Sequence, residues 1–199
     1  MYILPNKGLS DDEIEEIRDD YGIVFPEDYK EFLKKYNGGE TPMLECIHTD
    51  GFYSEIRALY GFKTGDQYTS IEEIPLPFDY DLEFWMENGL MPIGENLWGD
   101  LFMMNVKDAP GKVYYSDHEQ GFQLMLLARS FKEFIGLFGE LVLTESQKKE
   151  YQAIEESISR QVEEQGIAAL GKEGYEQHKE EGRKSALERE KRKVLLELS

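Results

Sequence analysis

The sequence contains a single cysteine, Cys46, among 199 residues. One cysteine cannot form an internal disulfide, and no second cysteine supplies the ligand spacing of a zinc site. No run of about eighteen apolar residues occurs, so the sequence predicts no membrane-spanning helix. Residues 1–7 lack the basic region and the apolar stretch of a signal peptide. We therefore expect a cytoplasmic protein that makes no membrane contact.

Basic residues are scarce. The chain has 22 Lys and Arg against 41 Asp and Glu, which gives a net charge of −19. Phosphate binding needs Lys and Arg, so we expect no binding of nucleic acid. The acidic excess lies before Glu145, because the 13 acidic and 11 basic residues from there onward nearly balance. An acidic body attracts basic proteins and speeds their association, although acidity can equally serve solubility alone.

Motifs of catalysis and cofactor binding are missing as well. The histidines His48, His118 and His178 are widely spaced, and no H-E-x-x-H, G-x-S-x-G, P-loop or dinucleotide motif occurs. Cys46 and His48 share one face of an expected strand, but a free cysteine is commonly a small core residue. His118 lies in a polar segment that is typical of a solvated turn. These features favour a protein that is not an enzyme and that binds no metal or cofactor.

Two helices are predicted near the start. The first begins at a capping box, with Ser10 as N-cap and Glu13 at the third helical position, and ends at Gly22. The second begins with Pro26 in its first turn and ends at residues 37–39. Its apolar side chains recur at the spacing of a helix buried along one stripe. These are Tyr29, Phe32, Leu33 and Tyr36.

The middle of the chain predicts a sheet that a third helix closes. Short apolar segments alternate with Gly, Pro, Asp and Asn, as strands do. They are residues 43–48, 56–62, 101–106, 112–116 and 123–128. The turn signal at residues 108–111 predicts a hairpin. The closing helix begins at Ser130 and carries Phe131 and Phe134 on one face. This order favours an α+β domain with a mainly antiparallel sheet.

The composition changes near residue 144. We expect one α+β domain over residues 1–144 and a charged helical C-terminal extension over residues 145–199. Gly166, Gly171 and Gly174 interrupt the helical pattern of this extension. Its apolar end, residues 194–198, is expected to dock either on the body or on a partner.

One turn carries the residues that we select as candidates for partner binding. Glu95, Asn96, Trp98 and Asp100 precede the strand that begins at residue 101. A tryptophan surrounded by acids in a turn is a candidate hot spot for a basic partner. The alternative, slightly favoured by the sequence, is that Trp98 folds inward and fills the core.

Four segments of the chain resemble the SUKH superfamily, which includes fungal regulators of cell-wall synthesis and bacterial immunity proteins. They are residues 14–22, residues 25–39 with the pattern P-x-x-Y-x-x-F-L … N-G-G, residues 90–100, and residues 127–134. The resemblance spans roughly residues 9–140. It implies a curved central sheet, no active site, and action by binding a toxin, often a nuclease. The residues that carry it are expected to serve the fold. They are Pro26, Tyr29, Phe32, Leu33, Gly38, Gly39, Phe131 and Phe134.

Three hypotheses about function follow. The first is an immunity protein that neutralises a cognate polymorphic toxin, such as a basic nuclease, by direct binding. The second is an intracellular regulatory or adaptor module that binds a host protein. The third is a hydrolase, which would need a well-formed polar pocket around His48 or His118.

Overall fold

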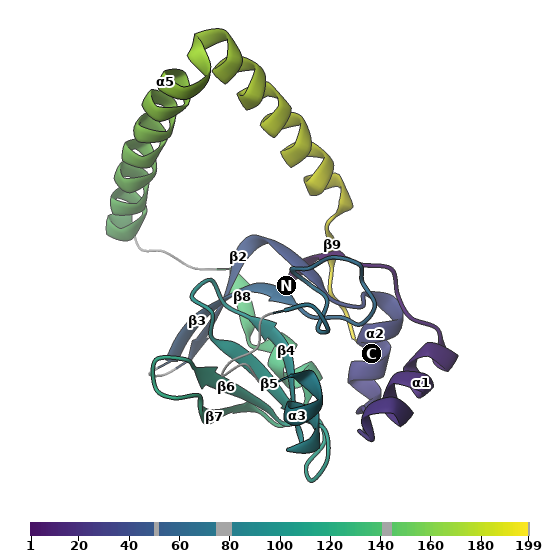
Figure 1. Ribbon diagram of the computed structural model, residues 1–199. Coiled ribbons are helices and arrows are strands. Elements are labelled where there is room, and N and C mark those ends of the chain that lie inside the picture. The colour runs from purple at the N-terminus through teal and green to yellow at the C-terminus, as the bar shows by residue number, and fades with distance from the viewer. Residues whose placement is uncertain (50–51, 75–80, 141–144, 199) are drawn as a thin grey trace. The chain divides into compact units, whose positions relative to one another are not determined.

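Figure 1 shows the computed structural model of the chain, which describes residues 1–49, 52–74, 81–140 and 145–198. The chain divides into two units, and each is described by itself. The first unit comprises Met1–Glu140 together with Lys193–Ser199, and the second comprises Leu141–Arg192. The last seven residues group with the body and not with the preceding helical segment. None of the described helices combines the length and the apolar character needed to span a bilayer.

The N-terminal helix pair forms as its caps predict. Helix α1, Asp11–Tyr21, begins at the capping box of Ser10 and Glu13 and ends at Gly22 in a left-handed conformation. Helix α2, Glu27–Lys35, follows Pro26, which is the N-cap and precedes the first helical residue. Three side chains of α2, Tyr29, Phe32 and Leu33, are fully buried. The helix pair therefore presents one apolar face to the core.

The segment after α2 crosses another part of the backbone at very short range. Asn37 and Gly38 both have positive φ, 44° and 79°. A Cβ atom on Gly38 would lie 2.4 Å from the backbone nitrogen of Gly61, and one on Gly39 would lie 2.1 Å from the carbonyl oxygen of Leu4. The glycine pair therefore permits the close approach of three backbone segments, whereas α2 has already ended at Lys35 with Tyr36 as its C-cap.

The Asn37 side chain ties the same crossing together. Its Nδ2 donates to the carbonyl oxygens of Lys7 and Phe62, at 3.1 and 2.8 Å. Its Oδ1 accepts from the backbone nitrogen of Phe62 at 2.9 Å. Asn37 is buried, so these bonds satisfy a polar group that would otherwise be costly to bury.

The strands form one curved, antiparallel sheet in the order β7-β6-β5-β4-β3-β2-β1-β9, with β8 paired to β2. The described strands are β1 (Tyr2–Pro5), β2 (Gly39–Thr49), β3 (Phe52–Leu59), β4 (Leu90–Glu95), β5 (Leu101–Asn105), β6 (Val113–Asp117), β7 (Gln123–Ala128), β8 (Phe138–Glu140) and β9 (Val194–Leu195). The expected hairpin through residues 108–111 joins β5 to β6. The α+β class with a mainly antiparallel sheet is confirmed.

Two short helices complete the first unit. Helix α3, Leu82–Glu87, is capped by Asp81, and helix α4, Phe131–Gly136, is capped by Ser130 as predicted. Phe131 packs against the rings of Tyr29 and Phe32, each 4.9 Å away between centroids. The helices are thereby joined through their aromatic side chains, since such contacts contribute beyond the burial of area.

The end of the chain docks on the body. Strand β9 pairs with β1, and the Leu196 backbone nitrogen donates to the carbonyl oxygen of Met1 at 3.0 Å. Leu196 is buried in the core, and the Tyr36 hydroxyl accepts from the backbone nitrogen of Glu197 at 3.0 Å. Of the two sites expected for the apolar end, the structure shows the body.

The second unit is one long helical segment, α5 (Glu145–Arg192). Its backbone leaves the helical conformation at Gly171, where φ is 71° and ψ is 165°. The Tyr175 ring packs on Gly166, where an added Cβ would lie 2.4 Å from Cδ2 of the ring. Of the three glycines expected to interrupt the helix, Gly171 is the one that breaks it.

Candidate partner-binding surface

The turn between β4 and β5 is held by the side chain of Asn96. Its Oδ1 accepts from the backbone nitrogens of Trp98 and Asp100, at 2.8 and 2.9 Å. The backbone nitrogen of Asn96 also donates to the Asp100 carbonyl oxygen, at 3.0 Å. The side chain thus imitates a backbone turn, and Asn96 is 3% exposed.

Asp100 joins this turn to the turn between β6 and β7. Its Oδ2 accepts from Asn96 Nδ2 and from the Tyr115 hydroxyl, and its Oδ1 accepts from the backbone nitrogen and Nδ1 of His118. Burial alone would raise the pKa of Asp100, but the bonds from Tyr115, His118 and Asn96 outweigh it and lower the pKa. The carboxylate is therefore charged at neutral pH, although Asp100 is only 6% exposed.

Trp98 points outward from this turn. It is 72% exposed, and the neighbouring Leu97 is exposed as well. The interpretation that Trp98 folds inward is therefore wrong. Asn96 and Asp100 occupy the inward positions, so the residues between them project into solvent. A large aromatic side chain that is mostly exposed on a fixed turn is unusual, because burying it would be favourable.

The structure brings the four predicted candidates together in one turn but gives them different surroundings. Glu95 is half-buried and forms an ion pair with Arg57, at 2.5 Å. Tyr60 also donates a hydrogen bond to Glu95. Burial raises the pKa of Tyr60, and the negative charge of Glu95 raises it further. Asn96 and Asp100 hold the turn from inside. Trp98 alone of the four presents most of its side chain to solvent.

Two adjoining hollows extend the surface from Trp98 to β7. The first has a volume of about 380 Å³ and is lined by Trp98, Asp100, Asp117, His118 and Glu119. The second has a volume of about 400 Å³ and is lined by Phe52, Tyr53, Tyr115, Asp117, Gln120, Gln123, Leu124 and Met125. Because Asp117 lines both, they form one continuous region. We call the residues of these two hollows the Trp98 surface.

Most of the Trp98 surface escaped prediction from the sequence. Phe52 and Tyr53 come from β3, and Asp117 and Met125 come from β6 and β7, so only strand pairing brings them beside Trp98. One signal was available in the sequence. Residues 124–127 are all apolar, whereas a strand with one solvated face alternates apolar and polar residues.

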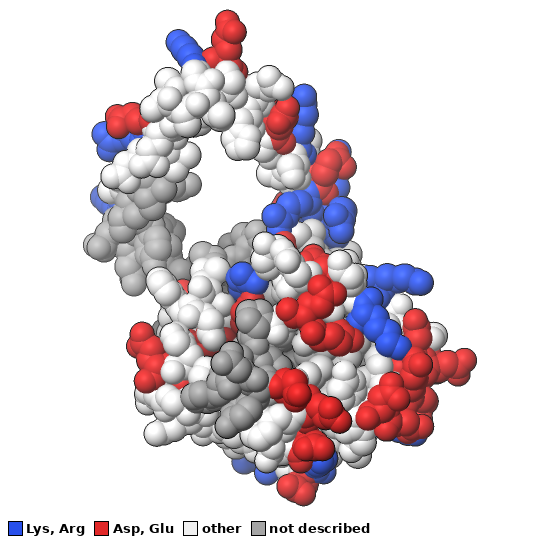
Figure 2. Space-filling view, in the orientation of Figure 1, with Lys and Arg blue, Asp and Glu red and all other residues white. Residues whose placement is uncertain are grey.

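Apart from the titratable His118, the charged side chains of the Trp98 surface are all acidic. No Lys or Arg occurs from Leu90 to Val106 or from Val113 to Ala128, the segments that supply most of its residues. Asp117 lines both hollows, and Glu119 lines the first. Acidic side chains also gather over α1, which has seven acidic residues and one Arg (Figure 2). The helix α1 is a separate acidic face, and its acids are partly paired, as in the ion pair of Lys63 with Glu16.

Three residues of the Trp98 surface have the composition of a cation site. Asp100, Asp117 and His118 offer ligand atoms that all lie within 4.8 Å of one another. Both oxygens of Asp100 already accept hydrogen bonds, and His118 Nδ1 lies 2.7 Å from one of them. A cation would have to displace these bonds. We therefore assign the cluster to holding the two turns together.

The residues considered for catalysis lie in separate places. Cys46 is buried, with its Sγ 3.4 Å from the Tyr53 hydroxyl, and the side chain of His48 lies outside the described part of the chain. His118 pairs with Asp100, as an oriented base would. Among the described residues, however, no Ser, Thr or Cys side chain is hydrogen-bonded to His118, and Ser116 instead donates to the Phe122 carbonyl oxygen. A nucleophile and its base are thus not assembled within the described residues.

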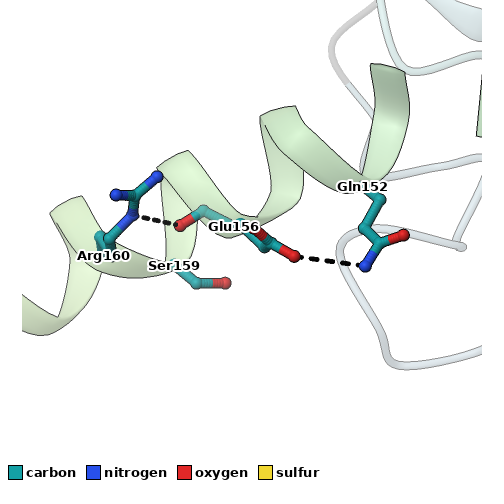
Figure 3. A pocket seen from close by; sticks show the side chains of 4 residues that line it. All are labelled: Gln152, Glu156, Ser159 and Arg160. Atoms are coloured by element: carbon teal, nitrogen blue, oxygen red, sulfur yellow. Dashed lines mark hydrogen bonds between the residues drawn. The ribbon is translucent and has the colours of Figure 1, made fainter. Parts of the chain in front are cut away.

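A further hollow lies along the first half of α5 (Figure 3). Its described lining residues are Gln152, Glu156, Ser159 and Arg160. Gln152 Nε2 donates to Glu156 Oε1, and Arg160 Nε donates to the Glu156 carbonyl oxygen, each at 3.2 Å. These are contacts within one helix, of the kind that stabilise an exposed helix face.

Comparison with known proteins identifies the family. No curated protein and no solved structure matches the chain. A family model matches residues 8–136, which include both N-terminal helices, the turn at Trp98 and α4. This match covers more than half of the chain and coincides with the region of the resemblance. The chain therefore belongs to the SMI1 / KNR4 family (SUKH-1).

Proposed function

We propose that this chain is a non-catalytic protein-binding domain that uses the Trp98 surface to bind a basic protein. More specifically, we propose an immunity protein that neutralises a cognate bacterial polymorphic toxin, such as a basic nuclease, in the cytoplasm. The observation that carries the proposal is the exposed Trp98 on a turn that buried Asn96 and Asp100 hold in place.

The rigid turn supports a binding role because a preformed side chain loses little conformational entropy when it binds. Tryptophan is the residue type most typical of binding hot spots. Trp98 is also bordered by residues that can surround such a contact, including Asp117 and Glu119. A partner that buried Trp98 would place its own basic groups beside these carboxylates.

The charge of the chain supports a basic partner. Complementary charge speeds the encounter of two proteins and excludes wrong partners. A nuclease carries basic residues where it holds phosphates. An acidic surface is suited to such a region and repels nucleic acid. Membership of the SUKH-1 family is consistent with this type of role.

The test is inhibition of the toxin domain encoded beside this chain. The full chain is mixed with that domain at stoichiometric amounts, and toxin activity and binding heat are measured. We expect inhibition, and we expect Trp98→Ala to weaken binding by about 2 kcal/mol or more, which is the loss typical of a hot spot. Val24→Ala is the matched control. Val24 is exposed, and its backbone nitrogen donates to Val106, which follows the end of β5, whereas Trp98 precedes the start of that strand. Undiminished toxin activity at equal amounts of the wild-type chain would refute the proposal.

A regulatory or adaptor role is the second candidate. The observation in its favour is the helical unit Leu141–Arg192, whose exposed side chains include Val162, Leu170 and Leu187. An adaptor would lose its partner when these three residues are replaced by Ser, whereas a toxin bound at Trp98 would remain inhibited. The two functions are therefore separable with one triple variant.

A further inference from the structure

Strand β7 is an edge strand that carries neither a charged residue nor a Pro. It ends the sheet order and pairs with β6 alone among the described strands. Leu124, Met125 and Leu126 are 44%, 41% and 51% exposed. Exposed edges are normally protected by charged residues, by Pro or by short length, because their free backbone groups pair with other strands. Across its six residues, β7 has no charged residue and no Pro, and its one irregularity is a bulge at Leu127, which leaves residues 123–126 in regular pairing with β6.

The opposite edge of the same sheet shows the contrast. Strand β9 has two residues, and Lys193 directly precedes it. Short length and a neighbouring lysine are two of the usual protections. Since the β9 edge has these protections and the β7 edge has no charged residue or Pro, the β7 edge is a candidate for strand addition.

The residues around β7 indicate which side chains a strand that pairs with it would carry. Tyr115 and Asp117 of β6 pair with Met125 and Gln123 of β7, so these four residues lie on one face of the sheet. That face continues through Asp117 to the hollow of Trp98 and Glu119. Aromatic rings and carboxylates both attract Lys and Arg side chains.

The other face of β7 is apolar. Leu124 and Leu126 project there, opposite Ser116 and Tyr114 of the neighbouring strand. An added strand with alternating side chains would place basic residues on the face of Tyr115 and Asp117, and apolar residues beside these leucines. Two copies of this chain fit poorly, because each has a net charge of −19 and none of the residues 113–128 is Lys or Arg.

We propose that β7 accepts an extended segment of the partner, with Lys or Arg at alternate positions, as an additional strand of the sheet. This inference rests on the proposed function and specifies how the basic partner is held. Backbone hydrogen bonds along β7 supply affinity, and Asp117 with the ring of Tyr115 supplies selection for basic side chains.

The probe is a six-residue peptide of alternating lysine and valine, which matches β7 in length. Its binding to the full chain is measured by calorimetry and by hydrogen exchange of the β7 amides. We expect saturable binding with slower exchange in β7. The same peptide N-methylated at alternate residues keeps its charge but loses half of its backbone donors, so we expect its binding to be weaker by a factor of at least about ten. Equal binding of the two peptides, or no saturable binding, overturns the inference.

A pair of variants provides the second arm. Leu126→Lys adds a charge to the edge, whereas Leu187→Lys adds the same charge to an exposed position on α5. We expect Leu126→Lys alone to reduce peptide binding at least about tenfold, because a lysine on the edge repels a basic strand. A dimer of the chain that Leu126→Lys dissolves would show that β7 pairs with itself, and would also overturn the inference.

The outcome for the toxin domain separates this inference from the proposed function. If Trp98→Ala weakens toxin binding but Leu126→Lys does not, the Trp98 surface binds the toxin without strand addition. If neither variant weakens it, the proposed use of the Trp98 surface itself fails.

Discussion

The Nδ1 atom of His118 lies 2.7 Å from Oδ1 of Asp100. This contact joins the turn between β6 and β7 to the turn that carries Trp98, because Asp100 also accepts from Asn96. The exposed tryptophan is therefore supported by a buried carboxylate and a titratable side chain. The hydrogen-bonding of the turn thus depends on the protonation of His118.

The first prediction concerns pH. The hydrogen bond to Asp100 raises the pKa of His118, and the negative charges of Asp100, Glu119 and Asp117 raise it further. Desolvation lowers the pKa, but by less than these effects raise it. A raised pKa means that the folded state binds the proton more tightly than the unfolded chain does. The resulting stabilisation is complete below the unfolded pKa of about 6.5 and is lost as pH rises through the folded pKa. NMR titration of the His118 ring should give a midpoint above about 6.5.

His118→Gln is the control for this prediction. Glutamine keeps a hydrogen-bond donor but does not titrate between pH 6 and 9. The decline in unfolding free energy over that range should therefore be shallower in His118→Gln than in the wild type. An NMR midpoint at or below that of an unfolded-peptide histidine would contradict the assignment of the hydrogen bond.

The second prediction separates crowding from backbone strain. Gly38 and Gly65 have similar φ values, 79° and 71°, but an added Cβ meets backbone atoms at Gly38 and nothing within 4 Å at Gly65. We expect Gly65→Ala to cost about 1–2 kcal/mol from strain alone. Gly38→Ala should cost at least about 3 kcal/mol, because the chain at Gly61 must also move. Urea unfolding of the two variants measures the difference, and equal losses would contradict the crowded crossing.

The helices could be predicted from the sequence because their signals are local. The capping box at Ser10 and the N-cap at Ser130 need only residues three positions away, and both are present in the structure. The apolar stripe of α2 is also local, since a periodic pattern defines the buried face by itself. The hairpin of β5 and β6 follows for the same reason, because one turn brings its strands together.

The parts that could not be predicted depend on contacts between distant segments. Strand β1 was missed, and its partners are Gly39 on one side and Val194 on the other. The sequence likewise predicts Asn37 only as a helix stop, because its partner Phe62 lies 25 residues away. Trp98 faces solvent because Asp100 takes the inward position of the turn, where it accepts from Tyr115 on β6 and from His118 in the next turn. These donors are distant in the sequence, so a local pattern does not reveal them.

The third prediction concerns the tyrosine of the P-x-x-Y pattern. The Tyr29 hydroxyl is buried and has no hydrogen-bond partner among the described residues. An unsatisfied buried hydroxyl is costly, so Tyr29→Phe should leave the unfolding free energy unchanged or raise it by about 1 kcal/mol. Tyr36→Phe is the matched control, because the Tyr36 hydroxyl accepts from Glu197. Its removal should lower stability and speed hydrogen exchange at Glu197. A loss of more than about 1 kcal/mol in Tyr29→Phe would indicate that the hydroxyl has a partner, such as water.

The fourth prediction tests whether the end of the chain belongs to the body. Leu196 is buried in the core, whereas the adjacent Leu195 is exposed on β9. Leu196→Ala should lower the unfolding free energy by about 2–4 kcal/mol, because a buried leucine loses its contacts and leaves a cavity. Leu195→Ala should change it by no more than about 0.5 kcal/mol.

Near-UV circular dichroism is the appropriate measurement for these two variants, because most aromatic residues lie in the body and the signal therefore follows the first unit. Removal of residues 193–199 should destabilise the body at least as much as Leu196→Ala, since it also removes the pairing of β9 with β1. If truncation and Leu196→Ala both leave the unfolding transition unchanged, the end of the chain is not part of the folded body. In that case β1 would be the edge of the sheet.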